Sequence, residues 1–201
     1  MKRVFDFTAS LFGLILLVPL FFFIGLLIKS EDKGPVFFRQ KRVGRYGKLF
    51  MLYKFRTMSV SVPDREGSFN PGDTSRITKT GKFLRKNKLD ELPQLINVFK
   101  GEMSLVGPRP EVEEWIAVYP ERWKQVLSVR PGITDSSSIV FRNEEALLAE
   151  SDDPEKTYKE IILPRKLDLY EYYLKNNSFF TDLKLILKTI YFLIFKEPFK
   201  L

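Results

Sequence analysis

Two adjacent acidic residues, Asp90 and Glu91, stand where the sequence changes charge most sharply. The preceding residues 76–88 carry six basic side chains and no acidic one. Fixed cations favour the ionised form of a nearby carboxylate, and they also bind phosphate oxygens. An ionised Asp90 in such surroundings has the chemistry to attack phosphorus. The alternative is structural, with Asp90 as a helix N-cap and Glu91 as an acid that matches the helix dipole.

The two carboxylates are expected to have different roles. Neighbouring residues on a helix point about 100° apart, so Asp90 and Glu91 do not form a close pair that shares one proton.

The chain also contains no histidine and no cysteine. This composition excludes disulfides, thiol chemistry, zinc sites built from Cys and His, and catalytic triads that use His. Any catalysis therefore uses carboxylates, hydroxyl groups, Lys, Arg or Tyr.

A short helix is predicted to position Asp90. Apolar residues at helical spacing run from Leu89 to Gly101, and glycine commonly ends helices. Pro93 would lie in the first turn, where its missing N–H costs no helical hydrogen bond. Asp90 is therefore expected near the N-terminus of this helix.

Basic residues elsewhere are candidates for phosphate contacts. Residues 35–58 are predicted to form a β-hairpin, in which Lys54 and Arg56 could line a phosphate site. The simpler interpretation is that this segment contacts anionic lipid headgroups. Arg109 lies between two prolines, and such a stiff loop suits a bidentate phosphate contact. The apolar stretch before Arg142 is strand-like.

The N-terminal segment is apolar enough to enter a membrane. Residues 7–28 contain no charged side chain, and a helix of this length, about 33 Å, can cross a bilayer. Pro19 in its middle is expected to kink or break the helix. Basic residues flank both ends, which draws both ends to the cytoplasm and favours a re-entrant helical hairpin. A single-pass helix with a tolerated proline kink is the alternative.

The sequence therefore predicts an irregular α/β protein in two parts. Residues 1–30 form the membrane-inserted helical hairpin, and residues 31–201 form a small cytosolic body with a short β-hairpin and several surface or amphipathic helices. Apolar side chains recur at helical spacing over residues 183–194, which fits an interfacial C-terminal helix or one packed on the core. The 201 residues suit one domain, and the net charge of +8 favours anionic partners: phosphate groups, nucleic acid or an acidic membrane.

Four short motifs follow the apolar segment in order: KFRTM at 54–58, LDELPQL at 89–95, GPRP at 107–110 and RPGIT at 130–134. Together they resemble the bacterial sugar transferase family, the small monotopic polyprenyl-phosphate phosphoglycosyl transferases. The resemblance implies an enzyme at the cytoplasmic face of the bacterial inner membrane that moves a phospho-sugar from a UDP-sugar to polyprenyl (undecaprenyl) phosphate, with Mg²⁺. Membrane lipids and downstream glycosyltransferases are further implied partners, and nucleic acid is not.

The resemblance also implies roles for individual residues. Asp90 would be the nucleophile that attacks the sugar-bearing phosphate and releases UMP, giving an aspartyl phospho-sugar. Asp90 and Glu91 would lie near Mg²⁺, with Glu91 as a metal ligand or a proton-handling partner. The expected phosphate contacts are Lys54, Arg56, Arg85, Arg109 and Arg142.

Relatives commonly have Ser before the hairpin proline, where this chain has Val18. The rival functions are a membrane-anchored basic protein that binds nucleic acid and a structural membrane scaffold.

Overall fold

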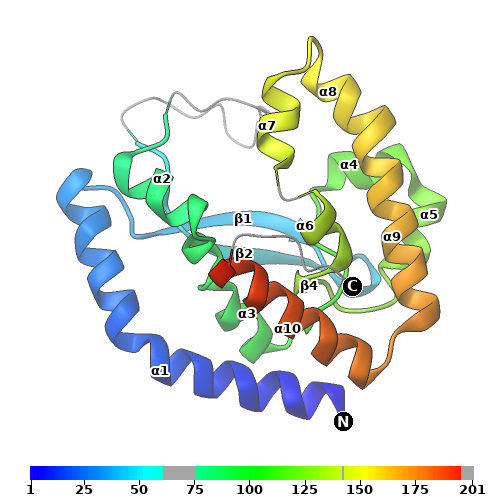
Figure 1. Cartoon of the computed structure of the whole chain (residues 1–201), viewed down its shortest axis with the longest axis horizontal. Coiled ribbons are helices and arrows are strands. Elements are labelled where there is room, and N and C mark those ends of the chain that lie inside the picture. The colour runs from blue at the N-terminus through cyan, green and yellow to red at the C-terminus, as the bar shows by residue number, and fades with distance from the viewer. Residues whose placement is uncertain (61–75, 142, 196–201) are drawn as a thin grey trace.

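The computed structural model describes residues 1–60, 76–141 and 143–195. Its fold is mixed α/β, as predicted, with one long apolar N-terminal helix and a small body that contains two short sheets. Figure 1 shows the N-terminal helix along one edge of the body, with the other helices around the strands. Arg142 and most of the loop predicted by composition after Val60 lie outside the described residues.

The N-terminal helix α1 (Lys2–Glu31) is continuous and contains Pro19. Figure 1 shows it bent between its two ends. A proline inside a helix removes one hydrogen bond and clashes with the carbonyl one turn earlier, so it bends the axis. No separate turn divides α1 into two antiparallel helices. The predicted hairpin is therefore not confirmed, and the break takes the form of a bend.

Both ends of α1 are fixed to the body. At its N-terminal end, Arg3 donates to the backbone oxygens of Val98 and Phe99 at 2.6 and 2.9 Å. At its C-terminal end, the Glu31 carboxylate accepts hydrogen bonds from the backbone N–H groups of Lys79 and Thr80 at 2.7 and 3.0 Å. Both ends of α1 are thus bound to the same small body.

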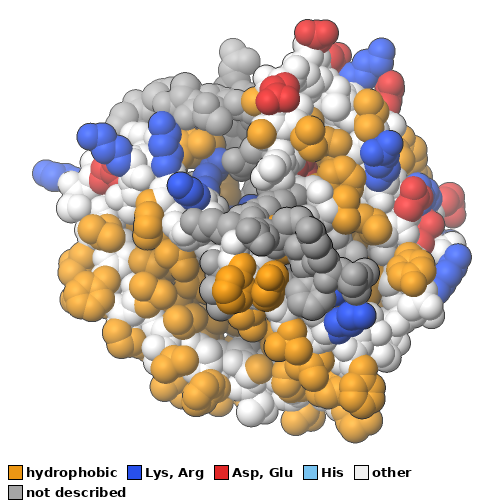
Figure 2. All heavy atoms as spheres, in the orientation of Figure 1, with side chains coloured by type: hydrophobic (Ala, Val, Ile, Leu, Met, Phe, Trp, Pro, Cys, Tyr) orange, Lys and Arg blue, Asp and Glu red, His pale blue; other side chains and the backbone are white. Residues whose placement is uncertain are grey.

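Much of the remaining α1 surface is apolar and exposed. Among the described residues, α1 is the one helix long and apolar enough to cross a membrane, and only 11% of its most apolar 18-residue window is buried. Figure 2 shows hydrophobic side chains gathered over α1. The exposed apolar residues between its ends include Phe12, Ile15, Leu16, Phe22 and Phe23. Most of this apolar surface is therefore not covered by the described body, unlike that of a core helix.

The predicted β-hairpin is confirmed. Strands β1 (Phe37–Val43) and β2 (Leu49–Phe55) pair antiparallel, with Phe37 opposite Phe55 and Val43 opposite Leu49. The turn between the strands contains Tyr46 and Gly47, both with positive φ. The buried Phe55 side chain at the end of β2 packs with Ile24 and Ile28 of α1 and with Leu84. The hairpin is thereby held between α1 and the elements that follow.

The segment that carries the two carboxylates comes next. Helix α2 (Lys79–Lys86) is followed by a 3₁₀ turn (Leu89–Glu91) and by α3 (Gln94–Lys100), which ends at Gly101 with φ 85°. Pro93 caps the start of α3. The prediction of a short helix with Asp90 near its N-terminus and glycine at its end is confirmed, with the first turn in 3₁₀ form.

A second sheet is formed by two very short parallel strands, β3 (Ser104–Val106) and β4 (Gly132–Thr134). A Cβ atom added at Gly132 would lie 2.1 Å from the backbone nitrogen of Gly107. Only glycine permits this close approach of the two chains. The GPRP and RPGIT motifs are thus packed against each other, which places Arg109 at the edge of this sheet.

The C-terminal part of the described chain is helical. Tyr158, Trp115, Trp123 and Tyr170 form the centre of its core. The long α9 begins after the wider π-helical turn Tyr158–Ile162. The helices in order are α4 (Glu113–Val118), α5 (Pro120–Val126), α6 (Ser136–Val140), α7 (Glu144–Ala149), α8 (Pro154–Thr157), α9 (Leu163–Asn176) and α10 (Phe179–Phe195).

Two predictions for this part have different outcomes. The prediction of a strand-like stretch before Arg142 is wrong, because residues 136–140 form the helix α6. The Asp135 carboxylate accepts from the backbone N–H groups of Ser137 and Ser138 and so begins a helix there. The amphipathic C-terminal helix is confirmed as α10, whose exposed side chains include Phe180, Leu187 and Ile190.

Candidate active site

Asp90 occupies a tight turn between α2 and α3, against strand β2. The residue before the turn, Lys88, has a left-handed conformation with φ 55°, which reverses the chain after α2. The Asp90 side chain is buried, with 7% of the residue exposed. Its Oδ1 atom has no hydrogen-bond partner among the described residues. A buried polar atom left unpaired costs about 1–3 kcal/mol, so such an atom marks a candidate functional site.

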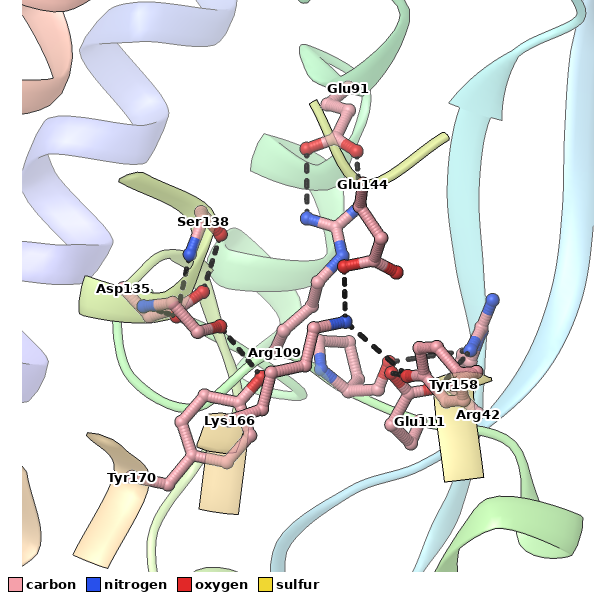
Figure 3. A network of polar contacts seen from close by, with 12 residues as sticks. Arg42, Glu91, Arg109, Glu111, Asp135, Ser138, Glu144, Tyr158, Lys166 and Tyr170 are labelled. Atoms are coloured by element: carbon pink, nitrogen blue, oxygen red, sulfur yellow. Dashed lines mark hydrogen bonds and ion pairs between the residues drawn. The ribbon is translucent and has the colours of Figure 1, made fainter. Parts of the chain in front are cut away.

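Glu91, the next residue, is fully engaged in ion pairs. Arg109 donates to both carboxylate oxygens, with the longer contact, Nη1 to Oε2, at 3.2 Å (Figure 3). The Nζ atom of Lys54 donates to Oε1 at 2.9 Å. The predicted phosphate-binding residues Lys54 and Arg109 therefore converge on Glu91 from two separate motifs.

The two carboxylates have opposite electrostatic shifts. Burial raises the pKa of Asp90, and the positive charge of Lys54 opposes this rise. Burial would also raise the pKa of Glu91, but the charges of Arg109 and Lys54 outweigh it and hold the pKa well below its usual range. The sequence predicts that neighbouring cations favour ionised Asp90; in the folded protein desolvation outweighs them. The two side chains therefore have different electrostatic environments.

Arg85 completes the basic surroundings of Asp90. Its Nε atom donates to Thr57 Oγ1 at 3.0 Å, which ties α2 to the KFRTM motif. Its charge, like those of Lys54 and Lys88, favours the ionised form of Asp90. The structure thus brings Lys54, Arg85 and Arg109 together around the two carboxylates.

Arg56 serves a different set of contacts. Its guanidinium donates to the Asp32 carboxylate at 2.7 Å and to backbone oxygens of Asp32, Pro35 and Met58 at 2.9, 2.6 and 3.3 Å. Only 6% of Arg56 is exposed. The backbone N–H groups of Val60 and Gly34, together with Arg56, hold the pKa of Asp32 well below its usual range. These contacts fasten the end of α1 to the hairpin.

Replacing Arg56 with glutamine is therefore expected to lower the melting temperature by several degrees and to leave KM for the substrates unchanged. The substitution removes one partner of a buried charge and leaves several carbonyl oxygens without donors. Thermal unfolding in detergent and steady-state kinetics at permissive temperature check this. A raised KM with an unchanged melting temperature would instead assign Arg56 to phosphate binding, the role predicted from its motif.

A buried ionic network extends from the site toward α9 (Figure 3). Lys166 donates to the Tyr158 hydroxyl at 3.3 Å and forms an ion pair with Glu144 at 2.7 Å. Tyr158 donates to Glu111 at 2.7 Å, and Glu111 accepts from Arg42 at 3.1 Å. Burial opposes ionisation of Glu111, but Arg42 and Lys166 outweigh it and hold its pKa low. Sequence reasoning did not single out these residues, because nothing local to each one signals a partner so distant in the chain.

Asp90 fits a magnesium ion that keeps most of its water or phosphate ligands. The described residues contain no group of three or more His, Cys, Asp or Glu side chains that could hold a metal. Mg²⁺ commonly binds one or two carboxylates together with substrate phosphates rather than a complete protein cage. The unpaired Oδ1 of Asp90 is suited to such a contact, whereas both Glu91 oxygens already accept from cations.

Comparison with known proteins shows which family this chain resembles. The family model described as bacterial sugar transferase matches residues 1–196. The chain is 40% identical over 190 residues to the sugar transferase EpsL of Bacillus subtilis, covering 94% of this chain and 85% of that protein.

Other relatives are longer. One is the UDP-N-acetylgalactosamine-undecaprenyl-phosphate N-acetylgalactosaminephosphotransferase of Aeromonas hydrophila, at 35% identity over 194 residues, covering 94% of this chain and 42% of that protein. Another is the undecaprenyl-phosphate galactose phosphotransferase of Salmonella typhimurium, at 34% over 204 residues, covering 94% and 39%. The chain thus spans about two fifths of these two relatives. With a family model that covers nearly the whole chain, the protein belongs to the bacterial sugar transferase family.

Proposed function

We propose that this protein transfers a phospho-sugar from a UDP-sugar to polyprenyl phosphate, with Asp90 as a covalent nucleophile. The family supports the reaction class, and the two longer relatives are named as undecaprenyl-phosphate sugar-phosphate transferases. The observation that carries the proposal is the buried Asp90 carboxylate, which has an unpaired oxygen and lies among Lys54, Arg85 and Lys88. A purely structural N-cap would instead have its carboxylate bonded to backbone N–H groups.

In the first step, an Asp90 carboxylate oxygen attacks the sugar-bearing phosphorus of the UDP-sugar. A bond forms between this oxygen and phosphorus, and the bond from phosphorus to the bridging oxygen breaks, so UMP leaves with the electron pair. The product on the enzyme is an aspartyl phospho-sugar. Because burial raises the free energy of the charged carboxylate, ionised Asp90 is a more reactive nucleophile here than a solvated one.

In the second step, a phosphate oxygen of polyprenyl phosphate attacks the same phosphorus. The bond from phosphorus to Asp90 breaks, which releases polyprenyl diphosphate-sugar and restores the carboxylate. Splitting the transfer in two allows the soluble donor and the lipid acceptor to react at one residue in turn.

The cations and Glu91 have separate tasks in both steps. Arg85 and Lys54, whose charges act on Asp90, would stabilise the negative charge that accumulates on the transferred phosphoryl group, since fixed cations stabilise such charge strongly in a buried site. Arg109 binds Glu91 through two contacts and so fixes the orientation of this carboxylate beside Asp90. Asp90, with Glu91 beside it, would hold Mg²⁺. Mg²⁺ would supply charge neutralisation on the diphosphate of the donor.

The protein is proposed to lie on the cytoplasmic face of the bacterial inner membrane, with α1 as a re-entrant element. Arg3 and Glu31, at opposite ends of α1, both bind the same small body. A helix that crosses a bilayer has its ends on opposite sides of the membrane, so a body that lies on one side could not contact both ends. The bend at Pro19 and the exposed apolar surface between the ends fit a helix that enters and leaves one leaflet.

This topology predicts the accessibility of three single cysteines, which are unambiguous labels because the chain has no cysteine of its own. Cysteine at Val4, at Ser30 or, as a control in the body, at Lys48 is expected to react with a membrane-impermeant thiol reagent from the cytoplasmic side. Inside-out and right-side-out vesicles compare the two sides. Labelling of positions 4 and 30 from opposite sides would show a spanning helix.

The enzymatic proposal is tested by UMP release. Purified protein in detergent is expected to release UMP from one member of a panel of UDP-sugars, with release dependent on Mg²⁺ and sustained only with polyprenyl phosphate. A nucleic-acid-binding protein or a scaffold would release none. Absence of UMP with every donor, in protein that is folded and membrane-associated, would reject the proposed function.

A further inference from the structure

A second basic cavity, of about 190 Å³, lies between the N-terminal end of α1 and the body. Its polar lining includes Lys2, Arg3, Asp6, Arg45, Arg130 and Tyr173. None of these residues takes part in the site around Asp90. Figure 1 shows the N-terminus of α1 near the junction of α9 and α10, to which Lys2 is joined by an ion pair with Asp182.

The cavity lies at the opposite end of α3 from the carboxylates. Arg3 donates to the oxygens of Val98 and Phe99 at the C-terminal end of α3, and the Nε atom of Arg130 donates to Gly101 O at 2.8 Å. The 3₁₀ turn with Asp90 precedes the other end of this helix. A helix of this length separates the two places by about 10 Å. The cavity is therefore distinct from the candidate active site.

Part of the basic lining has a structural explanation. Arg3 and Arg130 meet carbonyl oxygens at the negative end of α3, and the Lys2 charge is matched by Asp182. The Asp6 carboxylate accepts from Ser104 Oγ at 2.8 Å and from the backbone N–H of Leu105, so it neutralises none of the arginines by direct contact.

Unused donors remain after these contacts. Arg130 uses only its Nε atom, and Arg45 uses Nε for Ser128 O and Nη2 for Tyr46. Both terminal nitrogens of Arg130 and the Nη1 atom of Arg45 have no acceptor among the described residues. Three arginines against one aspartate, with free guanidinium donors, form a site for an oxygen-rich anion, and guanidinium matches phosphate geometry.

We propose that this cavity binds the phosphate group of an anionic phospholipid. Phe7 of α1 is exposed and apolar, and the guanidinium carbon of Arg3 lies 5.9 Å from the centroid of its ring. An anion site at the end of a helix whose surface is largely apolar and exposed fits a ligand with a charged head and a hydrocarbon tail. The inference uses the membrane position given under Proposed function, and the lipid would fix the depth at which the N-terminal end of α1 lies.

The test compares two double variants with equal loss of charge. Arg45→Gln with Arg130→Gln removes the free donors, and Lys124→Gln with Lys159→Gln removes two exposed cations elsewhere. Native mass spectrometry of the detergent-solubilised protein, titrated with phosphatidylglycerol, gives the apparent Kd. The cavity variant is expected to bind about tenfold more weakly than the wild type and the control variant. Phosphatidylcholine, which carries its own cation, is expected to bind weakly to all three proteins.

Two further measurements complete the comparison. Arg45→Lys with Arg130→Lys keeps the charges and is expected to recover part of the affinity, which separates loss of binding from loss of folding. The second measurement is the shift in melting temperature that inorganic phosphate causes in the wild type and in each variant. Equal phosphatidylglycerol affinity in the two glutamine variants would overturn the proposal, as would discrimination between them by inorganic phosphate alone, which would assign the cavity to a free anion. UMP release is read separately, so failure of the lipid site and failure of the enzymatic proposal are distinguishable.

Discussion

Replacing Asp90 with asparagine is expected to lower UMP release by about 10⁴-fold or more, because it removes the atom that bonds to phosphorus. Asparagine has the same shape and is neutral. Since burial raises the pKa of Asp90, the charged form is disfavoured in the folded protein, and a neutral replacement is expected to keep or raise the melting temperature. Lost activity with retained stability is therefore the signature of a nucleophile at this position.

Asp152→Asn is the matched control for this variant, because Asp152 is exposed and the substitution removes the same charge. It is expected to retain full activity, and both variants are expected to remain in the membrane fraction. Turnover by Asp90→Asn at more than a hundredth of the wild-type rate would contradict covalent catalysis by Asp90. A large fall in its melting temperature would show that Asp90 is an ordinary structural cap.

Arg109→Met is expected to have the second largest effect, on both activity and stability. The substitution leaves the buried Glu91 carboxylate with Lys54 as its remaining cation. Breaking a buried ion pair on one side costs about 3–5 kcal/mol, since the other charge stays desolvated. We also expect kcat to fall by about 10²-fold or more, because Glu91 loses its fixed orientation beside Asp90. Thermal unfolding and steady-state kinetics measure the two effects separately.

A second substitution separates these contributions. Glu91→Gln in the Arg109→Met background removes the buried carboxylate that has lost its bidentate partner, and it is expected to restore part of the lost stability but none of the activity. Arg109→Lys keeps the charge without the bidentate contact and is expected to fall between the wild type and Arg109→Met. An unchanged melting temperature in Arg109→Met would contradict the buried pairing of Glu91 with Arg109.

The parts of the fold that depend on neighbours in the sequence could be predicted. The β-hairpin, the short helix that ends at Gly101 and the amphipathic α10 follow from alternation, helical spacing and residue types with fixed backbone preferences. The strand predicted before Arg142 is wrong because Asp135 caps a helix over Ser136–Val140, and Ile139 and Val140, whose side chains suggest a strand, belong to that helix. Local hydrogen bonds to the Asp135 side chain override the weak strand preference of a short segment.

Several of the predicted site residues lie together in the fold, but Arg56 does not join them, and the electrostatics of the site could not be predicted. The charge change at Asp90 and the rigid loop at Arg109 are visible in the sequence. Which cation meets which carboxylate is decided by packing: Arg56 pairs with Asp32, whereas Lys54, two residues away, pairs with Glu91. The raised pKa of Asp90 likewise depends on burial by elements far apart in the chain. Residues such as Lys166 and Glu111 acquire their importance only in the folded protein.

The central claim is tested most directly by mass spectrometry of the protein after exposure to its UDP-sugar donor without polyprenyl phosphate. We predict a mass increase equal to one phospho-sugar, located by peptide mapping on Asp90, and lost when polyprenyl phosphate is added. UMP release without such an increase, or with the increase on another residue, would contradict the account.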